Sequence, residues 1–111
     1  VYTVELLPPL AERARDVLCR TLGLTNVHLR TGDGADGWPE AAPFDRVVVT
    51  AAAPAVPPAL LLQLAPGVRM ALPVGHAPGT QVLRLIEKGA DGSLAEKDLD
   101  EVVFVPLRSP A

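Results

Sequence analysis

Three short stretches of the chain carry residues that could bind a ligand. Glu5 follows an apolar run, and a carboxylate there can accept hydrogen bonds from both hydroxyls of a ribose. Asp33 lies between two glycines, where a carboxylate and backbone N–H groups could meet the edge of an adenine ring. The small residues 50–54 let a ligand approach the backbone closely. Taken together, these stretches favour a site for a cofactor that contains a nucleoside.

Each stretch alone also has an ordinary structural explanation. An acidic residue after a strand usually belongs to a solvated turn, and Gly32-Asp33-Gly34 is a common kind of turn sequence. The small residues 51–53 would also suit tight packing. The glycines do not form a phosphate loop, because Gly32, Gly34 and Gly37 lack the dinucleotide-binding spacing. The hypothesis therefore depends on the stretches occurring at three successive strand ends.

Other kinds of catalytic or metal site are not indicated. No nucleophile, base and orienting group occur together, so no catalytic residue is predicted. His28 is expected within a strand and His76 in a loop, both in structural or exposed roles. Cys19 is expected to be an inert thiol without metal-ligand neighbours, and Trp38 to anchor its loop.

The elements that must position these residues alternate between strand and helix. Strands are predicted over residues 1–4, 27–31, 44–49 and 69–74, with helices over residues 8–22, ended by Gly23, and 57–64. Apolar residues at the 3.6-residue period should bury one face of the first helix. Residues 47–49 are all valine, which is typical of a central strand covered on both faces.

The last part of the chain shows a different pattern. Residues 81–87 and 102–107 are predicted as an antiparallel strand pair at one sheet edge, because no convincing helix separates them. The fold class is therefore α/β, with a mostly parallel sheet and a C-terminal antiparallel pair. In such wound sheets ligands bind beyond the carboxyl ends of the strands, which is where the three stretches fall.

Length and composition limit the classes of protein. The chain has 111 residues, of which 49% are hydrophobic and 21% charged, as expected for one domain or part of one over residues 1–111. A formal net charge of −3 argues against a basic nucleic-acid surface. No apolar run is long enough to span a membrane, and residues 1–5 lack the basic and apolar regions of a secretory signal. The single cysteine fits a cytoplasmic location.

Motifs throughout the chain resemble protein-L-isoaspartate O-methyltransferases. The most specific are Ala51-Ala52-Ala53-Pro54 and Gly37-Trp38-Pro39, whereas an acidic residue like Glu5 after the first strand is common to many methyltransferases. The remaining matching segments are Val1-Tyr2-Thr3-Val4-Glu5, Leu10-Ala11-Glu12, Gly32-Asp33-Gly34, Phe44-Asp45 leading to Thr50, Pro57 to Leu60, Leu72-Pro73-Val74-Gly75 and Val105-Pro106-Leu107.

The resemblance implies a Rossmann-like, S-adenosylmethionine-dependent methyltransferase. Such an enzyme methylates the α-carboxylate of isoaspartyl residues in damaged peptides and proteins, and the ester then closes to a succinimide. By resemblance, Glu5 would bind the ribose and Asp33 with Gly34 the adenine edge, while Gln81 would help to hold the cofactor. The residues that would line the peptide site are Ala52, Ala53, Pro54, Val74 and Gly75.

The resemblance also implies that the domain is incomplete. In the family a glycine-rich cofactor loop, a hydroxyl residue for the isoaspartyl carboxylate and the first central strand lie upstream of a segment like residues 1–5. A C-terminal portion of the enzyme is thus expected to be inactive alone, and its open strand edges could make it self-associate. Two alternatives remain: a methyltransferase with another acceptor, and a non-catalytic interaction module.

Overall fold

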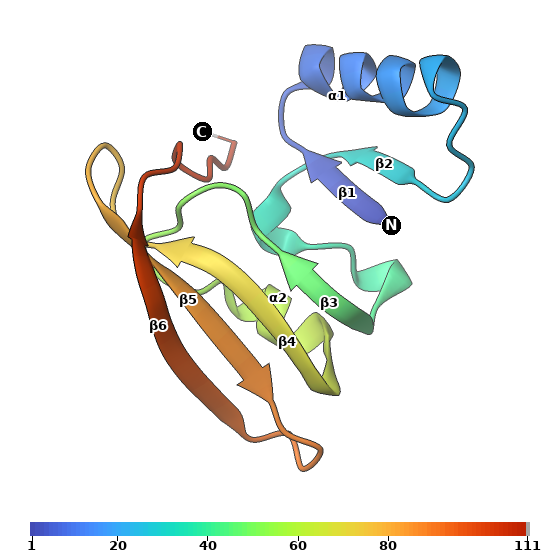
Figure 1. The fold of residues 1–111 in the computed structure, drawn as a ribbon. Coiled ribbons are helices and arrows are strands. Elements are labelled where there is room, and N and C mark those ends of the chain that lie inside the picture. The colour runs from blue at the N-terminus through green and yellow to red at the C-terminus, as the bar shows by residue number, and fades with distance from the viewer. Residues whose placement is uncertain (111) are drawn as a thin grey trace.

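The fold is α/β, as predicted. A computed structural model describes residues 1–110, and Figure 1 shows the order of the elements. The strands are β1 (Tyr2–Glu5), β2 (His28–Thr31), β3 (Phe44–Val48), β4 (Leu64–Val74), β5 (Gln81–Lys88) and β6 (Leu94–Val102). The helices are α1 (Pro8–Arg15), which continues as a π-helix (Asp16–Thr21), and α2 (Pro58–Gln63), with short 3-10 turns at Gly34–Asp36 and Pro39–Ala41.

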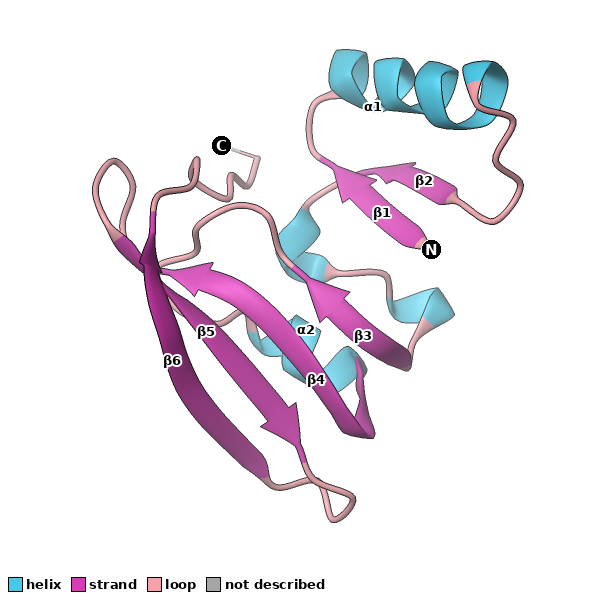
Figure 2. Cartoon of the chain, viewed as in Figure 1, coloured by secondary structure: helices cyan, strands magenta, loops and turns pink. Residues whose placement is uncertain are grey.

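The strands form two sheets whose parallel members point the same way. Strand β1 pairs in parallel with β2, and β3 pairs in parallel with β4. In Figure 1 the arrows of β1 to β4 all run toward the same side of the molecule. Figure 2 shows α1 beside the β1 and β2 pair and α2 behind β4. The carboxyl ends of four strands therefore lie along one edge.

The antiparallel part of the fold differs from the prediction. Strand β5 pairs with Leu94–Val102 on one side and with β4 on the other, both antiparallel. Of the predicted partner, residues 102–107, only Val102 pairs with β5, opposite Gln81, and Pro106 makes an isolated parallel bridge with Ala52. The prediction assigned the wrong segment, and the mixed sheet contains one antiparallel pair more than expected.

Strand β6 was missed because it shows no apolar alternation. Nearly all of its residues are exposed, and Arg84 of β5 forms ion pairs with two of its acidic residues. The Arg84 Nε donates to Asp98 Oδ1 at 2.9 Å, and Glu96 lies 3.8 Å from the same guanidinium. The hydrogen bond that Arg84 donates to Asp98 raises the pKa of Arg84. Cross-strand charge pairing of this kind does not appear in a hydrophobic pattern.

The core lies between α2 and the β3 to β5 part of the larger sheet. Five side chains are buried there: Leu60, Leu64, Met70, Leu72 and Ile86. Helix α2 ends at Gln63, one residue earlier than predicted, and β4 begins at the next residue, Leu64, whereas the prediction began this strand at residue 69. No loop separates this helix from the strand, and α2 packs on the sheet that contains β4.

Strand β3 is not the covered central strand that its valines suggested. It is the edge strand of its sheet, and Val48 is 72% exposed. Val47 and Val49 point the other way and pack against the core. Since successive side chains of a strand alternate between faces, one face is covered and the other is open in the described residues.

The first helix also buries less than predicted. Ala11 is its only buried residue, whereas Leu10, Val17 and Leu22 of the apolar stripe are exposed. Gly23 follows the helical segment at a φ of 67°, which supports the predicted end. The stripe is present, but nothing in residues 1–110 covers most of it. No helix in this part of the chain is both long and apolar enough to span a membrane.

A gap separates β1 from β3. A cavity of about 210 Å³ lies between them, lined by Tyr2 and Val4 on one side and by Arg46 and Val48 on the other. The carbonyl oxygens of Val1 and of the last β1 residue face β2, so by alternation Tyr2 and Val4 direct their backbone groups into the gap. Among residues 1–110, two unpaired strand edges therefore flank the gap.

We predict that Ile86→Ala lowers the free energy of unfolding by about 2 to 5 kcal/mol, because it leaves a cavity among fully buried side chains. Urea denaturation of both proteins measures the change. Leu62→Ala is the matched control, since Leu62 is 80% exposed and should cost little. Equal midpoints for Ile86→Ala and the unsubstituted protein would contradict the assignment of the core.

Candidate functional site

Glu5 and Asp33 lie next to each other in the fold at the ends of paired strands. Glu5 is in register with Thr31, and the N–H of Gly32 donates to the Glu5 carbonyl at 2.9 Å. The half-buried Glu5 carboxylate accepts one hydrogen bond, from the N–H of Leu6 at 3.1 Å. Because the strands are parallel, Asp33 follows immediately at the same edge. The structure therefore brings together two carboxylates that are 28 residues apart in sequence.

Asp33 shapes the turn that follows it. Its Oδ1 accepts a hydrogen bond from the N–H of Ala35 at 2.9 Å and so caps the 3-10 turn Gly34–Asp36. This leaves the second carboxylate oxygen available for another donor. Asp33 and Gly34 are both half-buried. The turn explanation and the ligand explanation of this sequence are thus compatible, because they use different atoms.

Trp38 anchors the same loop, as predicted. Its ring packs edge-on against Tyr2, with centroids 5.1 Å apart, and the Arg30 guanidinium lies 5.1 Å from its centroid. Tyr2 also stacks on His28, which places that histidine in the predicted structural role. Arg30 in turn pairs with Glu40, whose pKa is lowered by a backbone hydrogen bond within Glu40 and then by Arg30.

The predicted peptide-site residues gather around Ala53. Its N–H donates to the Pro73 carbonyl at 3.1 Å, and its carbonyl accepts from the N–H of Gly75 at 2.8 Å. An isolated parallel bridge therefore connects Ala53 with Val74. Ala53 is buried, whereas Pro54 beside it is exposed. Two segments separated by some 20 residues of sequence thus form one continuous surface.

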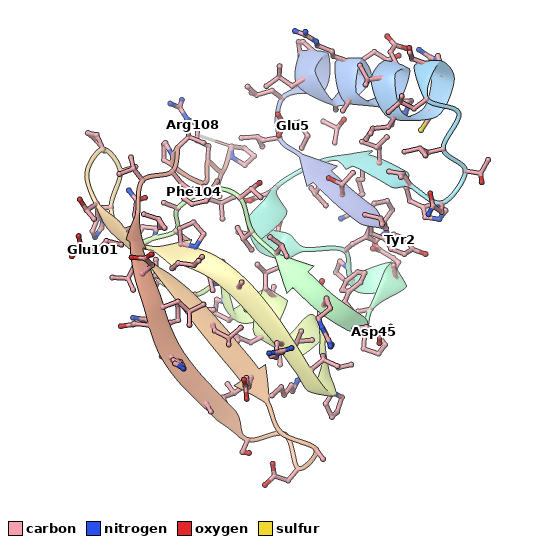
Figure 3. All side chains as sticks on the ribbon, in the orientation of Figure 1. Tyr2, Glu5, Asp45, Glu101, Phe104 and Arg108 are labelled. Carbon is pink, nitrogen blue, oxygen red and sulfur yellow. The ribbon has the colours of Figure 1, made fainter. Side chains whose placement is uncertain are left out.

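The C-terminal segment crosses between the two groups of residues. Ala52 donates its N–H to the Val105 carbonyl at 2.7 Å, and its own carbonyl accepts from the N–H of Leu107 at 2.8 Å. A Cβ added to Gly34 would lie 3.5 Å from the Leu107 side chain. Figure 3 shows Arg108 at the same end of the molecule as Glu5, whereas Asp45 lies at the start of β3, away from both. Residues 105–107 therefore connect the Asp33 loop with the alanine segment.

Gln81 lies with the peptide-site group. It is 1% exposed, and its Nε2 donates to the Gly79 carbonyl at 2.6 Å, with His76 O 3.5 Å away. Its Oε1 accepts from the N–H of Phe104 at 2.7 Å. A Cβ on Gly75 would meet Gln81 atoms at 3.1 to 3.2 Å. The amide is thus used within the chain, where it holds the 75–79 loop to the C-terminal segment.

Two features of this region were missed in the sequence analysis. Residues 105–107 were assigned to a strand, and the buried Gln63, which bonds to the Asp33 loop, was not singled out. The signal for the first was the motif Val105-Pro106-Leu107, whose proline suits an irregular segment. No signal marks Gln63, because glutamine is normally exposed. The described residues contain no cluster of His, Cys, Asp or Glu that could hold a metal.

Comparison with known proteins adds independent information. The family described as protein-L-isoaspartate(D-aspartate) O-methyltransferase matches residues 1–111. A protein-L-isoaspartate O-methyltransferase 1 from Anaeromyxobacter sp. (strain Fw109-5) is 66% identical over 107 residues, which are 96% of this chain and 50% of the relative. One from Nitrosospira multiformis is 54% identical over 108 residues, 97% of this chain and 45% of the relative. The chain thus spans about half the length of these curated relatives.

Solved structures show the same fold. A protein-L-isoaspartate O-methyltransferase superposes with a TM-score of 0.86 at 31% identity, covering 96% of this chain and 33% of that protein. A Plasmodium falciparum structure in complex with S-adenosyl-L-homocysteine has a TM-score of 0.83 at 24% identity, covering 99% of this chain and 53% of that one. The second likeness concerns the fold alone.

We predict that Gln81→Leu lowers the free energy of unfolding by about 1 to 3 kcal/mol, since it leaves buried partners without hydrogen bonds. The amide of Phe104 should exchange with deuterium faster in this variant. Thr80→Val, at an exposed neighbour, is the matched control. Unchanged exchange at Phe104 would show that Gln81 does not hold the C-terminal segment.

Proposed function

This chain belongs to the protein-L-isoaspartate(D-aspartate) O-methyltransferase family, and we propose that it forms the nucleoside side and the acceptor side of such an enzyme. The reaction transfers a methyl group from S-adenosylmethionine to the isoaspartyl carboxylate of damaged proteins. The observation that carries the proposal is the convergence of Glu5, Asp33 and Ala53 at the carboxyl edge of the parallel strands.

The nucleoside side suits an adenosine in its donors and acceptors. Glu5 has acceptor capacity beyond its single bond to Leu6, so it can take both ribose hydroxyls. The second oxygen of Asp33 and the N–H of Gly34 offer an acceptor and a donor to the adenine edge. Gly34 has no side chain to keep a ring away from its backbone. These residues fit the nucleoside part of S-adenosylmethionine.

Gln81 is the remaining member of the proposed cofactor set. The family resemblance supports a contact from its amide to the cofactor. In the structure, both ends of that amide are already bonded to Gly79 and Phe104. A cofactor contact therefore requires Gln81 to exchange one of these partners when the cofactor binds.

The acceptor side is built mainly from backbone and small residues. We propose that Ala52, Ala53, Pro54, Val74 and Gly75 line the peptide site. When bound, S-adenosylmethionine would supply an electrophilic methyl group on a sulfonium, which a carboxylate can take without any proton transfer. The chain therefore has to place the acceptor and exclude water, and it needs no general base. This agrees with the absence of a predicted catalytic triad.

The gap between β1 and β3 is compatible with one alternative, a non-catalytic interaction module. Its two unpaired strand edges could serve such a module as well as an incomplete enzyme. A methyltransferase with a different acceptor is disfavoured, because the family match covers the alanine segment of the acceptor side. We also propose a cytoplasmic location, for which a single free cysteine, Cys19, is suitable.

In the polypeptide extended to the length of its relatives, Glu5→Ala should weaken S-adenosylmethionine binding by about 1 to 3 kcal/mol, the scale of hydrogen bonds to a charged group. Asp33→Ala should act in the same direction. Calorimetric titration measures both. Asp45→Ala, which removes an exposed carboxylate at the amino-terminal end of β3, is the control and should bind normally. Unchanged affinity of a folded Glu5→Ala protein would remove Glu5 from the site.

The 111-residue chain alone should not methylate an isoaspartyl peptide, whereas the chain extended upstream through a glycine-rich loop should be active. Glu5 and Asp33 reach only the nucleoside end of the cofactor, and a misplacement of ~1 Å can already cost about 100-fold in rate. A radiolabelled-methyl assay measures turnover. Equal turnover by the two proteins would refute the proposed incompleteness.

Sedimentation of the same 111-residue sample should show self-association, which we expect through the open edges of β1 and β3.

A further inference from the structure

The buried side chain of Gln63 holds the loop that carries Asp33 and Gly34. Gln63 is 8% exposed, and both ends of its amide bond to the backbone of this loop. Its Oε1 accepts from the N–H of Trp38 at 2.8 Å, and its Nε2 donates to the Asp36 carbonyl at 2.9 Å. A single side chain therefore satisfies both a donor and an acceptor of the loop.

Helix α2 keeps Gln63 in place. Its neighbours Leu60 and Leu64 are 5% and 1% exposed in the hydrophobic core. At the end of the helix, Lys88 Nζ donates to the carbonyls of Leu61 and Leu64 at 3.1 and 3.0 Å. The amide of Gln63 is thus presented from an anchored element, and the loop is attached to the core rather than only to itself.

Gly37 is shaped to receive this amide. It is buried at a φ of 63°, and a Cβ added there would lie 2.2 Å from Gln63 Oε1. Any side chain at this position would push the amide away from both of its partners. The left-handed backbone also disfavours other residues. Gly37 and Gln63 therefore form one fitted contact between the loop and α2.

We propose that Gln63 is a positioning residue for cofactor binding, acting through the loop from Asp33 to Trp38. This inference rests on the proposed function and adds a residue outside the proposed cofactor and acceptor contacts. The Asp33 cap orders the turn internally, whereas the Gln63 amide sets where the turn lies relative to the sheet. An adenine edge can be recognised only if Asp33 and Gly34 are held at that place.

The test uses the polypeptide at the length of its relatives. Gln63→Leu removes both hydrogen bonds at similar volume, and it should weaken S-adenosyl-L-homocysteine binding in calorimetry by about tenfold. The KM for an isoaspartyl peptide should not change. Gln63→Glu keeps the acceptor for Trp38 and loses the donor to Asp36, so its affinity should be intermediate. Leu62→Ala, at the exposed neighbour on α2, is the matched control and should bind normally.

A double substitution tests the fitted contact itself. Gly37→Ala should weaken S-adenosyl-L-homocysteine binding on its own. In a Gln63→Ala background the same change should have a smaller effect, because the amide that it would strike is absent. Fully additive effects would mean that Gly37 and Gln63 act independently, and they would overturn the proposed contact.

The outcomes separate this inference from the proposed function. If the unsubstituted protein binds S-adenosyl-L-homocysteine and Gln63→Leu binds it equally well, positioning by Gln63 is refuted. Equal losses of cofactor and peptide affinity with a lower melting temperature would also refute it, since they indicate a general structural role. If the unsubstituted protein does not bind, the proposed function fails. The exchange rate of the Trp38 amide then tests the contact: faster exchange in Gln63→Leu supports it, and unchanged exchange refutes it.

Discussion

The backbone of Ala52 and Ala53 holds together segments that are far apart in sequence. Ala52 bonds through both its N–H and its carbonyl to residues 105–107, and Ala53 bonds in the same way to residues 73–75. Successive residues of an extended chain direct these groups to opposite sides, so one dipeptide can join two neighbours. Both residues are buried, at 2% and 3% exposed. The position of the proposed acceptor side depends on this arrangement.

The prediction from sequence succeeded in placing the candidate residues at the ends of strands. Alternation of strands and helices predicted that Glu5, Asp33 and the alanine segment would follow parallel strands, and the structure places them at one edge. Parallel pairing is sufficient for this, because it brings carboxyl ends together whatever the details of packing. The helix end at Gly23 and the anchoring of Trp38 were also predicted correctly.

The prediction failed where tertiary contacts override local pattern. The valine run of β3 suggested coverage on both faces, but Val48 is exposed because no described residue covers its face of the strand. Strand β6 is held beside Arg84 by charged residues that resemble a loop in sequence. The hydrogen bonds that Gln63 and Gln81 make within the chain were also not predicted, since a buried glutamine is recognised only by the partners that surround it.

In the proposed site, the nucleoside side and the acceptor side are formed by different residues along one edge of the strands. A titration followed by NMR tests this arrangement. In the polypeptide extended to the length of its relatives, S-adenosyl-L-homocysteine should shift the amide signals of Glu5 and Gly34. An isoaspartyl peptide should instead shift those of Ala53 and Gly75. Shifts confined to the opposite end of the strands, around Asp45, would contradict this arrangement of the site.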